Sequence, residues 1–257
     1  MDPVLEVQGL VKTFYLSKKQ QKLQNIPESR ITALAGVDFK VFPGQIYGLL
    51  GPNGAGKTTA LRIIATLIKA DSGDAKVFGR SVKTEPEFVR GKIGFLTSEL
   101  KLEDFFSPSY LFDFFSSLHQ VPPEVAKKRK ETLFTRFGIN DFAEVKVANL
   151  STGMRQKASL AISLVHDPDF IIFDEPTNGL DVLTAKVVTD FLLDLRNQGK
   201  TIIVSTHIFS LVEKICTHVG IIIKGRLVRE GSLEEICAGQ SLEDVFFKIF
   251  EEEGGTL

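Results

Sequence analysis

The sequence predicts an α/β fold in which helices cover a mostly parallel sheet. Three short apolar runs, at residues 170–173, 202–204 and 219–223, are separated by segments whose apolar residues recur at helical spacing. A parallel sheet with crossover helices requires such an alternation. Residues 99–166 lack this alternation of strands and helices, and their sequence patterns predict helices almost throughout. We therefore expect a helical subdomain inserted into a sheet domain.

In the N-terminal part, residues 4–14 and 37–42 predict two strands, because β-branched and polar residues alternate there. Between them, residues 16–30 are rich in lysine and glutamine and are expected to form a solvated loop. The apolar run at residues 46–50 predicts a third strand that ends in a glycine-rich turn. Residues 58–69 follow with apolar residues at helical spacing, so a strand, a loop and a helix are expected in this order.

The remaining helices are predicted from caps and periodicity. Ser107 and Pro108 are typical of an N-cap and a first helical turn. Residues 185–195 and 208–216 predict helices between the later strands, and residues 241–253 predict a C-terminal helix with an acidic first turn. The expected apolar face of that last helix consists of Leu242, Val245, Phe246, Ile249 and Phe250.

These elements give an expected organisation as one domain of 257 residues. The sheet core with its β region comprises residues 1–98 and 167–235. The helical subdomain comprises residues 99–166, and the C-terminal helix lies within residues 236–257.

Composition and charge argue against several functional classes. Of the 257 residues, 43% are apolar and 25% are charged, which argues against a disordered, collagenous or coiled-coil chain. The net charge is −1, from 31 basic and 32 acidic residues. The chain therefore has no overall positive electrostatic field that would attract nucleic acid, and no nucleic-acid partner is expected. The two cysteines, Cys216 and Cys237, have neither metal-ligand spacing nor a paired framework, which fits a reducing cytoplasm.

The sequence also predicts no direct membrane span. Residues 1–10 lack the basic start and the uninterrupted apolar stretch of a signal peptide. The longest apolar runs, at residues 201–212 and 219–223, are shorter than the roughly 18 to 20 residues that a membrane-spanning helix needs.

A phosphate-binding pattern lies between the third strand and the helix after it. It reads Gly51-Pro-Asn-Gly-Ala-Gly-Lys-Thr58 and matches G-x-x-x-x-G-K-[ST]. Glycines let successive backbone N–H groups point at phosphate oxygens, and the helix that begins near Lys57 adds its positive dipole end. We expect Lys57 to reach the β- and γ-phosphates of a nucleotide and Thr58 to coordinate Mg²⁺. The expected nucleotide contacts are Gly51, Pro52, Asn53, Gly54, Ala55, Gly56, Lys57, Thr58 and Thr59.

A pair of acids follows the apolar run at residues 170–173. A parallel sheet places Asp174 and Glu175 at its C-terminal edge, beside the phosphate loop. Asp174 is expected to hold Mg²⁺, directly or through water, and Glu175 to act as the general base that polarises the attacking water.

Three motifs follow the phosphate loop along the chain. Residues 150–156 read LSTGMRQ, residues 174–181 read DEPTNGLD and residues 205–207 read STH. In this order the motifs resemble those of the nucleotide-binding subunit of an ABC transporter, and the similarity covers nearly the whole chain. The resemblance implies a RecA-like P-loop NTPase fold with an antiparallel N-terminal β region. It also implies ATP hydrolysis with Mg²⁺ as cofactor, coupled to an integral membrane permease subunit at the cytoplasmic face of the cell membrane, where the chain would be a peripheral protein.

The resemblance further implies that a second ATPase subunit completes each site. Two subunits sandwich two ATP molecules, and each phosphate loop faces the signature segment of the other subunit. Ser151 and Gly153 then contact the γ-phosphate in trans, and Asp181 lies at the interface. A hydroxyl, a backbone N–H and a helix dipole are all anion ligands, which agrees with this role. Without a partner, Ser151 would be an N-cap alone; whether the partner is an identical subunit is left open, with a homodimer expected.

Two further residues match family positions. His207 matches the switch histidine, which approaches the γ-phosphate and the catalytic glutamate. Phe14 matches the aromatic residue that stacks on adenine, although a core role for Phe14 and the neighbouring candidate Tyr15 both remain open.

The sequence departs from the family pattern at two places. The signature has Thr152 and Met154 where the family has a glycine and a glutamine. Ser98 or Glu99 stands where the family usually has a glutamine that helps to ligate Mg²⁺. Either oxygen-bearing side chain suits a hard cation, and Ser98 is our candidate third metal ligand beside Thr58 and Asp174.

Seven phenylalanines and Tyr110 occur between Phe88 and Phe115, around the start of the helical subdomain. In the family this region faces the membrane subunit, and an aromatic groove is a usual acceptor for a partner helix. Core and docking roles both stay open, and Phe105 and Phe106 are expected to be the exposed pair.

The cargo is predicted from resemblance alone. Residues 93–119, together with LSTGMRQK, resemble the ATPase of bacterial sodium-export transporters, while export of a drug, lipid or peptide remains open. Non-transport ABC ATPases usually show a second cassette, a long coiled-coil insertion or zinc-binding cysteines, and the sequence has none of these. A P-loop kinase or GTPase would lack the signature segment.

Overall fold

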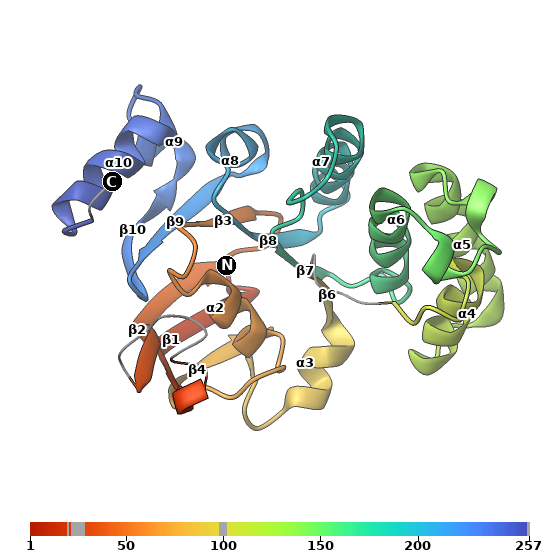
Figure 1. Cartoon of the computed structure of the whole chain (residues 1–257), viewed down its shortest axis with the longest axis horizontal. Coiled ribbons are helices and arrows are strands. Elements are labelled where there is room, and N and C mark those ends of the chain that lie inside the picture. Colours follow the sequence, from red (N-terminus) through yellow and green to blue (C-terminus); the bar gives the residue numbers. More distant parts are fainter. Residues whose placement is uncertain (20, 22–28, 98–101, 256–257) are drawn as a thin grey trace.

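The computed structural model describes residues 1–19, 21, 29–97 and 102–255, which form two sheets and a group of helices (Figure 1). The strands are β1 (Leu5–Tyr15), β2 (Arg30–Val41), β3 (Ile46–Leu50), β4 (Ser72–Val77), β5 (Arg80–Ser81), β6 (Ile93–Thr97), β7 (Phe170–Asp174), β8 (Thr201–Thr206), β9 (His218–Ile223) and β10 (Arg226–Ser232). The helices are α2 (Lys57–Ile64), α3 (Pro86–Lys92), α4 (Pro108–Leu118), α5 (Pro123–Phe137), α6 (Thr152–Ser163), α7 (Val182–Asn197), α8 (Phe209–Ile215), α9 (Leu233–Cys237) and α10 (Leu242–Glu252). Two short 3₁₀ helices, η1 (Asn140–Phe142) and η2 (Val147–Asn149), lie between α5 and α6.

The larger sheet confirms the predicted α/β fold. Its strand order is β10-β9-β3-β8-β7-β6, and its neighbouring strands run parallel except for the antiparallel pair β9 and β10. Every residue of β3 and β7 is buried, so these strands appear in the sequence as continuous apolar runs. Strand β10 was not predicted, because it is an edge strand whose residues are polar and mostly accessible.

The N-terminal sheet has the order β2-β1-β4-β5 and is antiparallel. Strand β2 begins at Arg30, earlier than the predicted residues 37–42, because residues 30–35 pair with the end of β1. Their side chains are largely accessible, so the first half of β2 lacks a buried apolar pattern. Of the loop expected at residues 16–30, residues 20 and 22–28 lie outside the described part of the chain.

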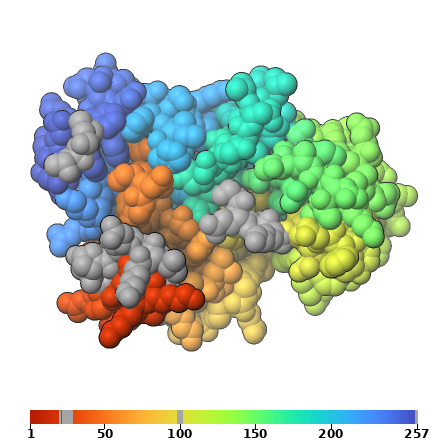
Figure 2. All heavy atoms as spheres, in the orientation of Figure 1, coloured from red at the N-terminus to blue at the C-terminus, as the bar shows by residue number. Residues whose placement is uncertain are grey.

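Residues 102–166 form α4, α5, α6 and the two 3₁₀ helices, and no strand occurs within this described range. They lie beyond strand β6, at the right of Figure 1, and project as a yellow-green lobe in Figure 2. The first of these helices starts as predicted. The Ser107 hydroxyl accepts a hydrogen bond from the Tyr110 N–H at 3.2 Å, and Pro108 occupies the first helical position.

The exposed aromatic residues of this lobe agree only partly with expectation. Phe105 is 80% exposed and Phe106 is 40% exposed, as predicted. Tyr110 and Phe114 are about as exposed as Phe106, at 51% and 49%, whereas Phe112 is buried. The aromatic surface therefore includes one face of α4, which the sequence analysis did not single out.

Helix α2 is shorter than the predicted residues 58–69 and ends at Ile64. Two residues later, Thr66 has a φ of 63°, in the left-handed region that no right-handed helix contains. The apolar spacing in the sequence continues beyond this point, which explains why the predicted helix was too long.

The C-terminal helix α10 packs on α8 along the predicted face. Leu242, Phe246 and Ile249 are buried, and the rings of Phe246 and Phe209 of α8 lie 5.1 Å apart. The remaining two predicted face residues, Val245 and Phe250, are partly buried against the same core. Among the described residues, no helix is both long enough and apolar enough to cross a bilayer.

Candidate nucleotide-binding site

The phosphate loop connects the buried strand β3 to helix α2, as predicted. Gly56 precedes α2 with a φ of 108°, and a Cβ there would lie 2.3 Å from the Ala33 carbonyl oxygen. A Cβ at Gly51 would lie 2.3 Å from the Ile222 carbonyl oxygen. Both positions therefore require glycine, because neighbouring backbone approaches the loop closely.

A cavity of about 340 Å³ opens at this loop. Of the predicted nucleotide contacts, Gly51 and Pro52 do not line it, whereas the rest of the loop does. Asn178 and Ala33 also line the cavity and were not among the predicted contacts: Asn178 lies within the motif at residues 174–181, where no role was assigned to it, and no motif includes Ala33. The full lining is Ala33, Asn53, Gly54, Ala55, Gly56, Lys57, Thr58, Thr59, Glu175, Asn178 and His207.

Lys57 supplies a buried cation to this cavity and is only 5% exposed. Its Nζ donates hydrogen bonds to the carbonyl oxygens of Gly51, at 2.7 Å, and Pro52, at 3.2 Å. The same atom lies 3.6 Å from Oε1 of Glu175. Burial lowers the pKa of the Lys57 ammonium, while the nearby carboxylates of Glu175 and Asp174 raise it.

The C-terminal end of β7 brings Asp174 beside the phosphate loop, as predicted. The Thr58 hydroxyl donates a hydrogen bond to Oδ1 of Asp174 at 2.9 Å. A hydroxyl and a carboxylate are oxygen ligands of the kind that Mg²⁺ prefers, so this pair fits the metal. Ser98, the third predicted ligand, and Glu99, its alternative, lie outside the described residues.

Glu175 leaves the strand and turns toward the loop. Its φ of 53° is in the left-handed region, and its N–H donates to the Ser205 carbonyl oxygen at 3.1 Å. His207 faces it, with Nδ1 at 3.2 Å from the carboxylate. Oε2 of Glu175 is buried and also lies 3.2 Å from His207 Nδ1, but among the described residues no donor makes a hydrogen bond of good geometry to it. One carboxylate oxygen is thus available to a further donor, as a general base requires.

The residues predicted to act in trans do not line this cavity. Ser151 and Asp181 are exposed N-caps of α6 and α7. A Cβ at Gly153 would lie 3.4 Å from the Thr184 hydroxyl and 3.8 Å from the Asp181 carboxylate, so the signature segment and Asp181 form one cluster. The hydrogen bond from the Thr184 hydroxyl to Asp181, at 2.7 Å, lowers the pKa of that carboxyl.

The predicted adenine-stacking residue lies on the N-terminal sheet. Phe14 is near the end of β1 and is 38% exposed, so it is not a core residue. The Lys12 ammonium lies 5.5 Å from the centre of its ring. Tyr15, the other candidate, is 80% exposed, and neither ring lines the phosphate cavity.

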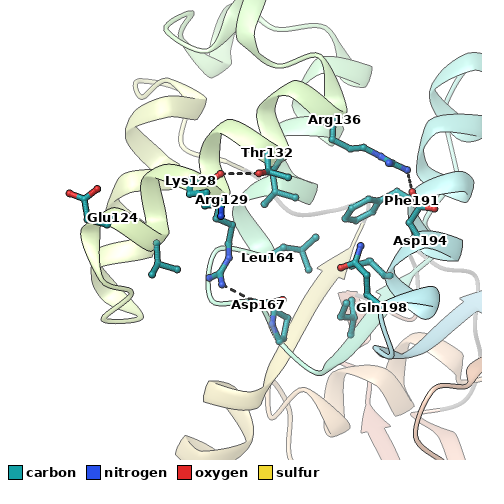
Figure 3. Close-up of a pocket in the computed structure, with 15 residues that line it drawn as sticks. Glu124, Lys128, Arg129, Thr132, Arg136, Leu164, Asp167, Phe191, Asp194 and Gln198 are labelled. Carbon is teal, nitrogen blue, oxygen red and sulfur yellow. Dashed lines mark hydrogen bonds and ion pairs between the residues drawn. The ribbon is translucent and has the colours of Figure 1, made fainter.

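A second cavity, of about 570 Å³, lies between α5 and α7 (Figure 3). Its wall includes the apolar side chains of Leu164 and Phe191. An ion pair between Arg136 of α5 and Asp194 of α7 crosses it, and Arg129 contacts Asp167 at 3.3 Å. No residue of the phosphate loop lines this cavity, so it is separate from the nucleotide site.

Comparisons with known proteins agree with this geometry. The family model described as "ABC transporter" matches residues 34–178, more than half of the chain. The chain is 37% identical to the ABC transporter ATP-binding protein NatA of Bacillus subtilis (strain 168), over 84% of this chain and 88% of that protein. It is 31% identical to the daunorubicin/doxorubicin resistance ATP-binding protein DrrA of Streptomyces peucetius, over 90% of this chain and 66% of that protein.

A solved structure of an ATP-binding subunit of an ABC transporter has the same fold. It superposes with a TM-score of 0.83 and 24% sequence identity, over 96% of this chain and 99% of that one. In this chain the phosphate loop, Asp174 at the end of β7, the following Glu175 and His207 lie together at one edge of the larger sheet. The chain belongs to the ABC transporter family, as an ATP-binding subunit that hydrolyses ATP to power transport.

Proposed function

We propose that the chain powers the export of sodium ions through a separate membrane subunit, as a peripheral protein at the cytoplasmic face. The ATPase part of this proposal is carried by one observation: Lys57, Glu175 and His207 converge on one cavity. Sodium as cargo is supported by the resemblance of residues 93–119 and of LSTGMRQK to sodium-export ATPases.

In the proposed reaction the phosphate loop and Lys57 hold the phosphates of ATP. Oε2 of Glu175 accepts a proton from a water molecule, whose oxygen attacks the γ-phosphorus. The bond from that phosphorus to the bridging oxygen breaks, and ADP leaves with the electron pair. His207 holds the Glu175 carboxylate at 3.2 Å in the orientation that this transfer needs. Thr58 and Asp174, with Ser98, would hold Mg²⁺, and its charge would neutralise the phosphate oxygens when it is bound.

A second ATPase subunit, expected to be a copy of this chain, completes the proposed site. Ser151, Gly153 and Asp181 cluster away from their own phosphate cavity, which supports a role in trans. In this arrangement residues 99–166 act as the helical subdomain that presents Ser151 to the partner's ATP. The Ser151 hydroxyl, with the N-terminus of α6 behind it, suits a γ-phosphate.

The aromatic face of α4 is the proposed docking surface for the permease. The rings of Phe106 and Tyr110 stack at 4.6 Å, and those of Tyr110 and Phe114 at 6.5 Å. The three rings line one side of a groove of about 730 Å³ that also includes Phe95 of β6. Such a groove suits a helix from the membrane subunit.

The docking surface predicts the effect of removing one ring. Tyr110→Ala should lower the amount of permease that copurifies with the chain from membranes, while ATP binding stays unchanged. Phe88→Ala is the matched control, because Phe88 is also exposed but lies outside the groove. Equal recovery of permease with Tyr110→Ala and with the wild type would contradict docking at this face.

The cargo is tested in inside-out membrane vesicles that contain the chain and its copurifying permease. ATP should drive uptake of radioactive sodium, and Lys57→Ala should abolish it. The second candidate cargo is a drug, which the similarity to the daunorubicin/doxorubicin resistance protein favours. ATP-driven uptake of daunorubicin without uptake of sodium would therefore replace the sodium proposal.

A further inference from the structure

Ser205 carries a fully buried hydroxyl next to both acids of the site. It begins the STH motif, in which only His207 has an assigned role. Ser205 lies near the end of β8, where the parallel register places it opposite Asp174 of β7. The Ser205 hydroxyl donates a hydrogen bond to Oδ1 of Asp174 at 2.5 Å. The hydroxyl oxygen of Ser205 also accepts a hydrogen bond from the Glu175 N–H at 3.2 Å. One side chain thus contacts the residue proposed to bind the metal and the residue proposed to be the base.

The first contact fixes the orientation of the Asp174 carboxylate. Rotation about the last bond of an aspartate is only weakly restricted by the chain itself, so hydrogen bonds must set it. Oδ1 of Asp174 receives two of them, from Ser205 at 2.5 Å and from Thr58 at 2.9 Å. Hydrogen bonds to an ionised carboxylate are among the strongest in proteins, and Asp174 is buried.

The second contact fixes the backbone of Glu175. A φ of 53° is unfavourable for a residue with a side chain, so the surrounding contacts must hold it. The Glu175 N–H is shared between the carbonyl and the hydroxyl of Ser205, at 3.1 and 3.2 Å. This turn directs the Glu175 side chain toward Lys57 and His207 instead of along the strand.

We propose that Ser205 is a positioning residue for ATP hydrolysis, whose hydroxyl fixes the orientation of both acidic residues at once. Ser205 does not line the nucleotide cavity, so it acts through Asp174 and Glu175. The inference rests on the proposed roles of these two residues.

The test compares Ser205→Ala with Thr201→Val, using the purified full chain. Thr201 begins the same strand, is also buried, and its hydroxyl accepts a hydrogen bond from the Gly44 N–H at 3.0 Å. Both variants lose a buried hydroxyl, but only Ser205→Ala loses one next to the site. Each variant is measured for kcat, for ATP binding in EDTA, for Mn²⁺ binding with ADP by electron paramagnetic resonance, and for thermal unfolding.

Ser205→Ala should lower both kcat and the affinity for Mn²⁺ about 10-fold or more, the usual effect of removing a hydrogen bond from a metal-ligating carboxylate. ATP binding in EDTA should stay unchanged, because the phosphate loop is intact. Thr201→Val should keep the wild-type kcat and Mn²⁺ affinity. Ser205→Thr, which keeps the hydroxyl, should recover most of the Mn²⁺ affinity.

Wild-type kcat and Mn²⁺ affinity in Ser205→Ala would overturn the inference, and so would equal losses in Thr201→Val. If Ser205→Ala does not fold, Ser205→Cys replaces it, since a thiol has nearly the same shape and is a weak donor. Wild-type Mn²⁺ affinity in that variant would also overturn the inference. A wild-type chain that hydrolyses no ATP would instead refute the proposed reaction, so the two failures are distinguishable.

Discussion

Glu175→Gln is the sharpest test of the proposed reaction, because it keeps the shape of the side chain and removes its charge. The Glu175 carboxylate is proposed to accept the proton of the attacking water, which an amide cannot do. We expect kcat to fall about 100-fold or more, the usual contribution of a general base. Nucleotide binding should persist, because the phosphate loop, Thr58 and Asp174 are unchanged.

The structure also predicts the direction of the change in ATP affinity. Lys57 Nζ lies 3.6 Å from Glu175 Oε1, and both side chains are largely buried. At an effective dielectric constant of about 20, this pair attracts by about 5 kcal/mol, before the cost of desolvation. Glu175→Gln removes the attraction, so the ammonium is freer to bind phosphate. ATP should therefore bind to the variant at least as tightly as to the wild type.

The assay combines turnover with size-exclusion chromatography in ATP, in ADP and without nucleotide. Because Ser151 and Gly153 are proposed to bind the γ-phosphate in trans, the variant should accumulate as a dimer in ATP alone. Glu87→Gln, an exposed change of the same kind on α3, is the control and should behave as the wild type. A wild-type rate in Glu175→Gln would refute the assignment of the base, and equal dimer in all three conditions would refute the ATP sandwich.

Lys57→Ala should abolish hydrolysis and weaken ATP binding, because the buried ammonium beside the loop is lost; near-normal turnover would contradict the site. Gly56→Ala should lower the free energy of unfolding by well over the ~1 kcal/mol that a left-handed φ alone costs, because its Cβ would meet the Ala33 carbonyl oxygen at 2.3 Å. Gly79→Ala, with a φ of 76° and nothing within 4 Å of the added Cβ, should lose only that ~1 kcal/mol in a urea titration. Burial raises the pKa of both cysteine thiols, but Cys216 is buried whereas Cys237 is partly accessible, so iodoacetamide should label Cys237 first, as peptide mass spectrometry can show.

The sequence predicts those parts of the site that depend on local patterns. The phosphate loop is contiguous in sequence, and at Gly51 and Gly56 an added Cβ would lie 2.3 Å from a backbone carbonyl oxygen. Asp174 was located because a continuous apolar run precedes it in a fully buried strand. These signals do not depend on knowing the tertiary structure.

The missed features depend on contacts between distant segments. Ser205 contacts Asp174 because β7 and β8 pair in a register that places the two residues opposite each other. The sequence alone does not give the register between two strands. The start of β2 and the whole of β10 lie at sheet edges, and few of their residues are buried, so no regular apolar pattern marks them in the sequence. The aromatic face of α4 was underestimated because helical spacing alone does not distinguish Tyr110, on the accessible side, from the buried Phe112.

The strand order has a consequence for how the protein can be divided. Strands β3 and β7, which carry the phosphate loop and the acids, are not neighbours; β8 lies between them and comes from residues 201–206, later in the chain. A fragment that ends at residue 178, like the matched family region, contains every residue of the phosphate loop and both acids, yet it lacks the strand that joins them. The position of the acids relative to the phosphate loop therefore depends on a strand that the chain supplies only after both motifs, so the site requires residues well beyond the segment that contains its motifs.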